Sequence, residues 1–168
     1  MDLVVIRHAI AEERDAFART GKPDDLRPLT AEGIEQMERG MRGLRRVQSD
    51  LDVLASSPLT RAQQTAAIVA REYGMGETIT TDVLRPDAAF DDFVGWAYSL
   101  DSDDVVAIVG HEPHLSALVS WLLAGGDDAE IELKKGSACL LSFEGTPRRG
   151  EGELRWLLTP KELRAMAK

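Results

Sequence analysis

Short, unbroken apolar runs that alternate with amphipathic segments constrain the fold of this chain more than any other feature of its sequence. Residues 3–6 (LVVI) and 105–109 (VVAIV) contain no polar side chain, which is typical of strands buried on both faces of a sheet. Between them lies a segment whose apolar residues recur at spacings of three and four, as on the buried face of a helix: Ile34, Met37, Met41, Leu44 and Val47. Buried strands alternating with helices predict an α/β fold.

Capping residues and turns place the remaining elements. Thr30 is a candidate N-cap for the helix that ends near Val47, and Ser57 with Pro58 predicts the start of a helix that runs to about Tyr73. Further strands are predicted at 52–55, 78–81, 138–143 and 154–158, with helices at about 90–100 and 113–123 and a last helix after the capping box at 159–162. The strands at 138–143 and 154–158 form a predicted hairpin. The expected fold class is a three-layer α/β/α sandwich with a mainly parallel sheet.

Length, charge and cysteine content narrow the class of protein. A chain of 168 residues fits one domain spanning 1–168, because folding at this size buries roughly two thirds of the unfolded surface. The formal charge of −9 argues against nucleic acid or an anionic membrane as a partner. The N-terminal apolar run is too short for a signal peptide, and no apolar stretch approaches membrane-spanning length, so we expect a cytoplasmic protein. The single cysteine, Cys139, is expected in the core.

Cations and histidines gather directly after three of the predicted strands. The segments are Arg7-His8, residues 56–61 (SSPLTR) and residues 110–114 (GHEPH), and together they contain all three histidines of the chain. In α/β sheets, ligands bind at the carboxyl ends of the strands. The fold argument alone therefore brings these segments to one edge of the sheet.

Two of these residues, Arg7 and Arg61, are suited to bind a phosphoryl group. Arg61 is expected in the first turns of its helix, where the positive end of the macrodipole disfavours a cation unless an anion is bound nearby. A guanidinium group offers forked donors that match phosphoryl oxygens. Salt bridges to carboxylates are the alternative role for both arginines.

The histidines have two alternative roles, a structural one and a metal-binding one. His111 is a candidate for the site, whereas His114 lies at a helix start and is expected to be structural. Zinc held by His8, His111 and His114 is the metal alternative. Against it, two neighbouring arginines repel a divalent cation, and no carboxylate follows His8 before Glu12.

Four segments resemble motifs of one family. Residues 3–9 (LVVIRHA) resemble the Arg-His-Gly signature of the histidine phosphatase superfamily, and residues 57–65 (SPLTRAQQT) and Gly110-His111 are similar to its second and third motifs. Residues 27–33 (RPLTAEG) match a fourth. The order of the motifs and the short length resemble the compact SixA-type phosphohistidine phosphatases, which have a phosphoglycerate mutase-like fold.

The resemblance implies a metal-independent phosphatase with no cofactor. In that scheme neutral His8 is the nucleophile, a phosphohistidine intermediate forms, and Arg7, Arg61 and His111 complete the catalytic phosphate pocket. The flanking arginines are expected to lower the pKa of His8 and keep it neutral.

Two departures from the family pattern affect these expectations. The family usually has glycine where this chain has Ala9, which we expect the fold to absorb, since alanine tolerates negative φ. Larger relatives have a glutamate proton donor in the segment corresponding to residues 84–87, and this chain has none there. Asp82 and Asp87 are candidate substitutes, with turn formation as the alternative. A missing acid favours P–N over P–O substrates, because imidazole is the better leaving group.

The sequence indicates the substrate class less directly than the catalytic residues. We expect a phosphorylated protein, for instance a histidine-containing phosphotransfer domain, with a phosphomonoesterase for a small phosphorylated metabolite and a non-catalytic phosphoprotein-binding domain as alternatives. The polar stretch 11–28 is expected to be a loop bordering the site that selects the substrate or is merely solvated. Arg27 within it fits either the pocket or a salt bridge.

Overall fold

The computed structural model describes residues 1–126 and 131–168. Within these residues six strands form one sheet in the order β3-β2-β4-β1-β5-β6. The neighbouring strands β3, β2, β4 and β1 pair in parallel, and β5 is antiparallel to both of its neighbours, β1 and β6. The strand bounds are β1 Asp2–Arg7, β2 Val53–Ser56, β3 Ile79–Thr80, β4 Val105–Gly110, β5 Ala138–Ser142 and β6 Glu153–Leu158. The predicted mainly parallel sheet is confirmed.

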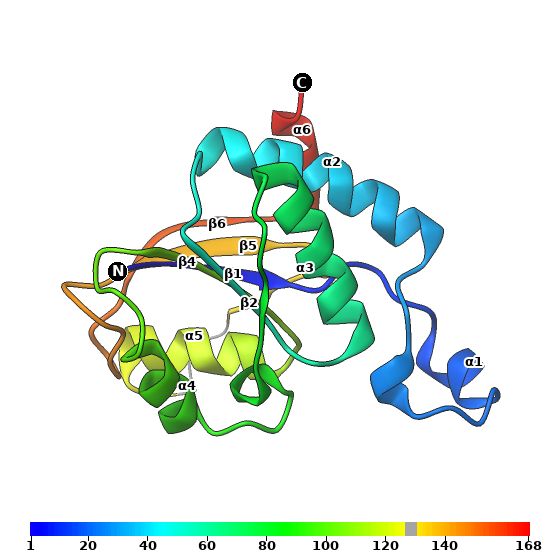
Figure 1. The fold of residues 1–168 in the computed structure, drawn as a ribbon, viewed down its shortest axis with the longest axis horizontal. Coiled ribbons are helices and arrows are strands. Elements are labelled where there is room, and N and C mark those ends of the chain that lie inside the picture. The colour runs from blue at the N-terminus through cyan, green and yellow to red at the C-terminus, as the bar shows by residue number, and fades with distance from the viewer. Residues whose placement is uncertain (127–130) are drawn as a thin grey trace.

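Helices cover both faces of the sheet (Figure 1). On one face lie α2, α3 and α6, and on the other lie α4 and α5, whereas α1 is at one end of the sheet. The bounds are α1 Arg14–Ala18, α2 Ala31–Val47, α3 Thr60–Tyr73, α4 Phe90–Ala97, α5 His114–Ala124 and α6 Pro160–Met166, with short 3-10 turns at Asp24–Leu26 and Asp82–Leu84. Each face of β1 packs into its own apolar core, which explains why residues 3–6 carry no polar side chain.

The predicted caps of two helices are confirmed. The Thr30 hydroxyl accepts a hydrogen bond from the Gly33 amide at 2.9 Å and begins α2, and Thr159 forms a capping box with Glu162 at the start of α6. The prediction that Ser57 caps α3 is wrong, because α3 begins at Thr60 after an extended Leu59. The Ser57 amide donates to Val109 O of β4 at 3.0 Å, which keeps Ser57 in line with the strand.

The stretch 11–28 is not the plain loop that its polarity predicts. It contains α1 and the 3-10 turn Asp24–Leu26, and Phe17 on α1 is buried. Phe17 anchors a segment whose other side chains are mostly exposed, and the buried Arg27 fixes its second half through bonds to Asp24 and Glu12 O.

Two glycines allow α2 to touch backbone at both ends. A Cβ at Gly33 would overlap the Ile10 carbonyl, just after β1, and a Cβ at Gly43 would overlap the Leu163 carbonyl of α6. Gly33 belongs to the motif at 27–33, so this motif fixes how closely the helix approaches the segment that follows β1. Neither glycine has a positive φ, and the requirement is for space.

Cys139 is buried in β5 as expected, and burial raises the pKa of its thiol to about 12. Among the described residues, no helix has the length and apolar character needed to cross a membrane.

Candidate active site

Adjacent strands bring the predicted site segments together. In the sheet register Arg7 at the end of β1 pairs with Gly110 at the end of β4, and Ser56 at the end of β2 pairs with Val109. The His8 amide donates to Gly110 O at 3.0 Å, which ties the first segment to the third. The three segments meet at one edge of the sheet, as the fold argument predicts. We call Arg7, His8, Arg61 and His111 the edge cluster.

His8 presents a defined tautomer. Its Nδ1 lies 2.7 Å from Ala9 O, and because a carbonyl only accepts, Nδ1 carries the proton and the lone pair is on Nε2. The side chain is buried, with 5% of its residue surface exposed. Burial lowers the pKa of His8 to about 3, while the hydrogen bond to Ala9 opposes that shift and the charges of the nearby arginines add to it. The arginines act in the predicted direction, but burial is the larger cause.

His111 lies beside His8. The two ring centroids are 5.1 Å apart and the rings are tilted by 52°. Burial, followed by the charges of His8 and Arg61, lowers the pKa of His111 to about 2. Both ring nitrogens are buried and have no hydrogen-bond partner within the described part of the chain. Unpaired buried nitrogens are costly, so they mark a place for a polar ligand.

The two arginines of the edge cluster are each anchored through Nη1. Arg7 Nη1 donates to Leu133 O at 2.7 Å, and Arg61 Nη1 donates to Asp24 O at 3.1 Å. Burial lowers the pKa of both guanidinium groups, although an arginine stays charged at neutral pH. The Nε atoms of both are buried without a partner in residues 1–126 and 131–168. Two buried cationic donors are thus left for an anion.

Asp24 and Arg27 lie next to Arg61. The sequence predicts no role for Asp24 and leaves two roles open for Arg27. Asp24 Oδ2 lies 3.2 Å from Arg61 Nη1, and Arg27 Nε lies 2.8 Å from Asp24 Oδ1. Arg27 also donates Nη1 to Glu12 O at 2.7 Å. Of the two roles considered for Arg27, the structure shows the salt bridge. The spacing of three between Asp24 and Arg27 was the available signal, but such pairs are common on surfaces.

Thr65, the last residue of the motif at 57–65, connects two segments of the site. The sequence predicts no role for it. Its hydroxyl accepts from the Ala9 amide at 3.1 Å and donates to Arg61 O at 2.7 Å. One buried hydroxyl therefore holds the residue after His8 to the first turn of α3. Next to it, Gln64 Oε1 accepts from the Leu29 amide at 2.7 Å. These bonds explain the polar side chains of Gln64 and Thr65 in the motif at 57–65.

His114 and Asp82 have their bonding partners outside the edge cluster. His114 Nε2 is 3.1 Å from Ala88 O and its ring packs on Phe90, which agrees with the structural role expected for it. Asp82 and Asp87 are exposed on the segment after β3. Asp82 makes a 3.7 Å salt bridge with Arg85, consistent with a local turn role.

Glu112 is a carboxyl group near the cluster that the sequence analysis did not weigh. It follows His111, is half-buried, and its Oε1 lies inside the protein. Burial raises the pKa of Glu112, and the neighbouring Ser116 and the charge of Arg7 oppose that rise only in part. Glu112 is therefore the carboxyl group beside the cluster most able to hold a proton.

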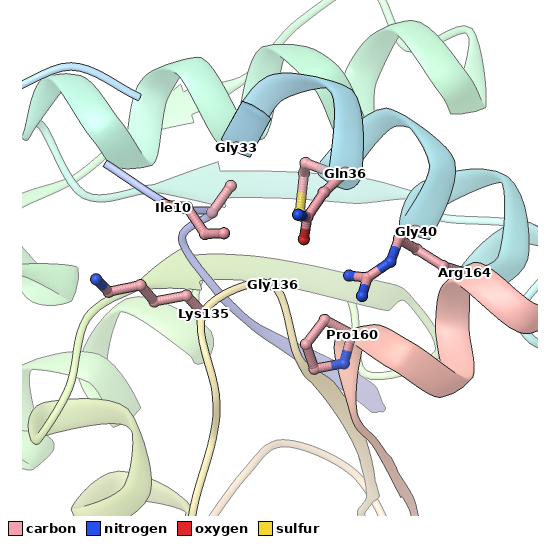
Figure 2. Close-up of a pocket in the computed structure, with 10 residues that line it drawn as sticks. Ile10, Gly33, Gln36, Gly40, Lys135, Gly136, Pro160 and Arg164 are labelled. Atoms are coloured by element: carbon pink, nitrogen blue, oxygen red, sulfur yellow. The ribbon is translucent and has the colours of Figure 1, made fainter. Parts of the chain in front are cut away.

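Neither a metal-ligand cluster nor the pocket between α2 and α6 competes with the edge cluster. In the described ranges, no three His, Cys, Asp or Glu side chains are grouped as metal ligands. The pocket lies near Ile10, Gly136 and Pro160 (Figure 2). Its lining among the described residues includes no member of the edge cluster. The edge cluster is therefore the candidate active site, where a neutral imidazole with a free Nε2 lies among cationic donors suited to a phosphoryl group.

Comparisons with known proteins identify the family of this chain. The model of the histidine phosphatase superfamily (branch 1) matches residues 3–95. An uncharacterized protein of Picosynechococcus sp. is 30% identical over 169 residues, covering 97% of this chain and 99% of its own.

Solved structures show the same fold. A protein histidine phosphatase SixA complexed with tungstate has a TM-score of 0.80 at 22% identity, covering 97% of this chain and 99% of its own. A phosphoserine phosphatase from Entamoeba histolytica, in complex with 3-phosphoglyceric acid, has a TM-score of 0.70 at 17% identity, covering 96% and 98%.

Proposed function

Because the chain belongs to the histidine phosphatase superfamily and is a phosphatase, we propose that it transfers phosphoryl groups through His8 and that its substrate is phosphohistidine on a protein. The observation that carries the proposal is the tautomer of His8. With Nδ1–H donated to Ala9 O, the lone pair of Nε2 is free beside His111 and the unpaired Nε donors of the two arginines.

The reaction has two displacements. In the first, His8 Nε2 attacks phosphorus in line, the new P–N bond forms as the bond to the leaving group breaks, and the leaving group departs with the electron pair. In the second, water attacks the phosphorylated His8, inorganic phosphate leaves, and the P–N electron pair returns to Nε2. Arg7 and Arg61 hold the equatorial oxygens throughout, and the proton lost by water passes to phosphate or solvent.

A phosphoramidate substrate suits the carboxyl groups around this site other than Glu112. Asp82 and Asp87 are exposed and Asp24 is bound to two arginines, so none of them is set up as a proton donor. The imidazole of a phosphohistidine whose ring is protonated leaves as a neutral molecule and needs no acid from the enzyme. A protein carrying the phosphohistidine, such as a histidine-containing phosphotransfer domain, is the partner we propose, and the cytoplasm is the compartment.

The proposal is tested by trapping the intermediate. Wild type and His8→Ala are exposed briefly to a ³²P-phosphohistidine peptide and quenched without acid. We expect an alkali-stable, acid-labile label on the wild type that is absent from His8→Ala. Label or turnover that survives the substitution would overturn the role of His8. A wild type that binds the peptide without turnover would instead favour a non-catalytic phosphoprotein-binding domain.

A small phosphomonoester is the second candidate substrate, and Glu112 is the observation that favours it. A carboxyl group whose pKa is raised by burial beside the cluster could protonate an alkoxide leaving group. The phosphoserine phosphatase with the same fold has a substrate of this kind. Turnover of phosphohistidine and phosphoserine peptides under identical conditions distinguishes the two: faster turnover of phosphoserine would contradict the phosphohistidine proposal.

A further inference from the structure

Arg61 is fixed through one side of its guanidinium group. Nη1 donates to Asp24 O at 3.1 Å and lies 3.2 Å from Asp24 Oδ2, so the backbone and the side chain of one residue share it. Nε, on the opposite side of the planar group, is buried and has no partner among the described residues. The Arg61 side chain is only 4% exposed, so its guanidinium group has little freedom to rotate.

Asp24 is held in turn by a second buried cation. Arg27 Nε donates to Asp24 Oδ1 at 2.8 Å, which leaves Oδ2 for Arg61. Arg27 itself is 8% exposed and is fixed by its bond to Glu12 O. The carboxylate therefore bridges two buried arginines, one oxygen to each, while the exposed Arg14 lies 3.9 Å from Oδ1. Arg61 receives an acceptor whose position is already set.

The electrostatics keep this bridge ionised. Burial alone raises the pKa of Asp24, but the hydrogen bond from Arg27 and the charges of Arg61 and Arg27 outweigh that effect and lower it. A charged acceptor makes a stronger hydrogen bond to a guanidinium group than a neutral one.

We propose that Asp24 is a positioning residue, whose carboxylate orients Arg61 so that its Nε side is free to bind a phosphoryl oxygen. The proposal rests on the role of Arg61 as a phosphate ligand in the proposed function. Because Asp24 contacts Nη1 and leaves Nε free, the phosphoryl group does not need to displace it. Asp24 acts through Arg61 and does not touch the reacting atoms.

The neighbouring residue provides a matched control. Asp25 lies in the same 3-10 turn and also binds an arginine, with Asp25 Oδ2 2.8 Å from Arg85 Nη2. Its side chain is half exposed, and its partner is outside the edge cluster. Asp25→Ala removes a carboxylate–arginine pair of this turn that does not reach the edge cluster. Asp24→Ala removes the carboxylate contacts with Arg61, Arg27 and Arg14, so only this variant takes the carboxylate acceptor from Arg61, whose Nη1 keeps its bond to the backbone at residue 24.

The first readout is the split between kcat and KM on a phosphohistidine peptide. Since a hydrogen bond to a charged group contributes about 1.5–3 kcal/mol, we expect kcat of Asp24→Ala to fall about 10- to 100-fold, with KM changed less than kcat. Asp25→Ala should keep the wild-type kcat, and thermal unfolding should show both variants folded. If Asp24→Ala does not fold, Asp24→Asn provides the same comparison with the shape retained. Equal kcat in the aspartate 24 and 25 variants would overturn the proposal.

The second readout needs no substrate turnover. The ¹H–¹⁵N signal of Arg61 Nε, assigned by its loss in Arg61→Lys, is followed during titration with inorganic phosphate. We expect a sharp signal that shifts with phosphate in wild type and Asp25→Ala, and a broadened one in Asp24→Ala. An identical shift in Asp24→Ala, or tighter phosphate binding by it, would refute positioning by Asp24. The absence of any shift in wild type would instead refute Arg61 as a phosphate ligand.

Discussion

Replacing Thr65 by valine tests how much one buried hydroxyl contributes to the site. Valine has nearly the same volume, so the change removes two hydrogen bonds and leaves the packing in place. The Ala9 amide then has no acceptor in a buried position, which costs about 1–3 kcal/mol of unfolding free energy. For a chain of this size each kcal/mol lowers the melting temperature by about 2–4 °C, so we expect Tm to fall by roughly 2–12 °C.

The catalytic consequence separates this effect from simple destabilisation. Ala9 follows His8, so release of its amide loosens the nucleophile, and we expect kcat on a phosphohistidine peptide to fall about tenfold, since small misplacements of reacting groups are costly. Thr65→Ser is the control: it keeps the hydroxyl and loses a methyl group, which costs about 0.8 kcal/mol of stability. Equal kcat in the serine and valine variants would refute the reasoning.

Three further outcomes are expected. The free energy of unfolding should fall on acidification from about pH 6.5 toward 3, by about 1.4 kcal/mol per pH unit for each imidazole, because unfolded histidines bind protons that buried His8 and His111 do not. Urea titrations of His8→Gln across this range should show a smaller dependence of the unfolding free energy on pH. An unchanged dependence would contradict the lowered pKa of His8. Glu112→Gln should reduce phosphoserine turnover at least tenfold and leave phosphohistidine turnover within about twofold, and equal losses on both peptides would remove Glu112 as an acid. Gly33→Ala should lower the free energy of unfolding by about 1–3 kcal/mol, because the added Cβ overlaps Ile10 O. Gly40→Ala, whose Cβ would lie 3.9 Å from its nearest atom, should be neutral or stabilising. Chemical denaturation measures both variants, and equal stabilities would contradict the close approach of α2 to Ile10.

The fold and the edge cluster were predictable from the sequence because they depend on local patterns. Buried strands and capped helices have short-range signatures, and the order of elements then places residues 7–8 and 110–111 at the same edge. The start of α3 was predicted wrongly because Ser57 also bonds to β4, a contact that no local pattern encodes.

The supporting residues were less predictable, since their roles depend on contacts between distant segments. Asp24 and Arg61 are 37 residues apart, and Ala9 and Thr65 are 56 apart. In the sequence, Asp24 is one of 29 acidic residues, and its spacing of three from Arg27 is too common a pattern to single it out. The same holds for Glu112, whose raised pKa comes from burial that only the fold produces.

The segments that follow β1 and β3 are held by two different kinds of contact, backbone contacts with α2 in one case and an ion pair in the other. Where Gly33 and Gly43 meet carbonyls, the helix cannot slide or lift without separating atoms already in contact. By contrast, the segment at 11–28 meets the segment after β3 through the half-exposed ion pair of Asp25 and Arg85. We expect a bulky substrate to enter by separating these two segments, so the rate of its exchange should depend on salt, which weakens exposed ion pairs and leaves backbone contacts unchanged.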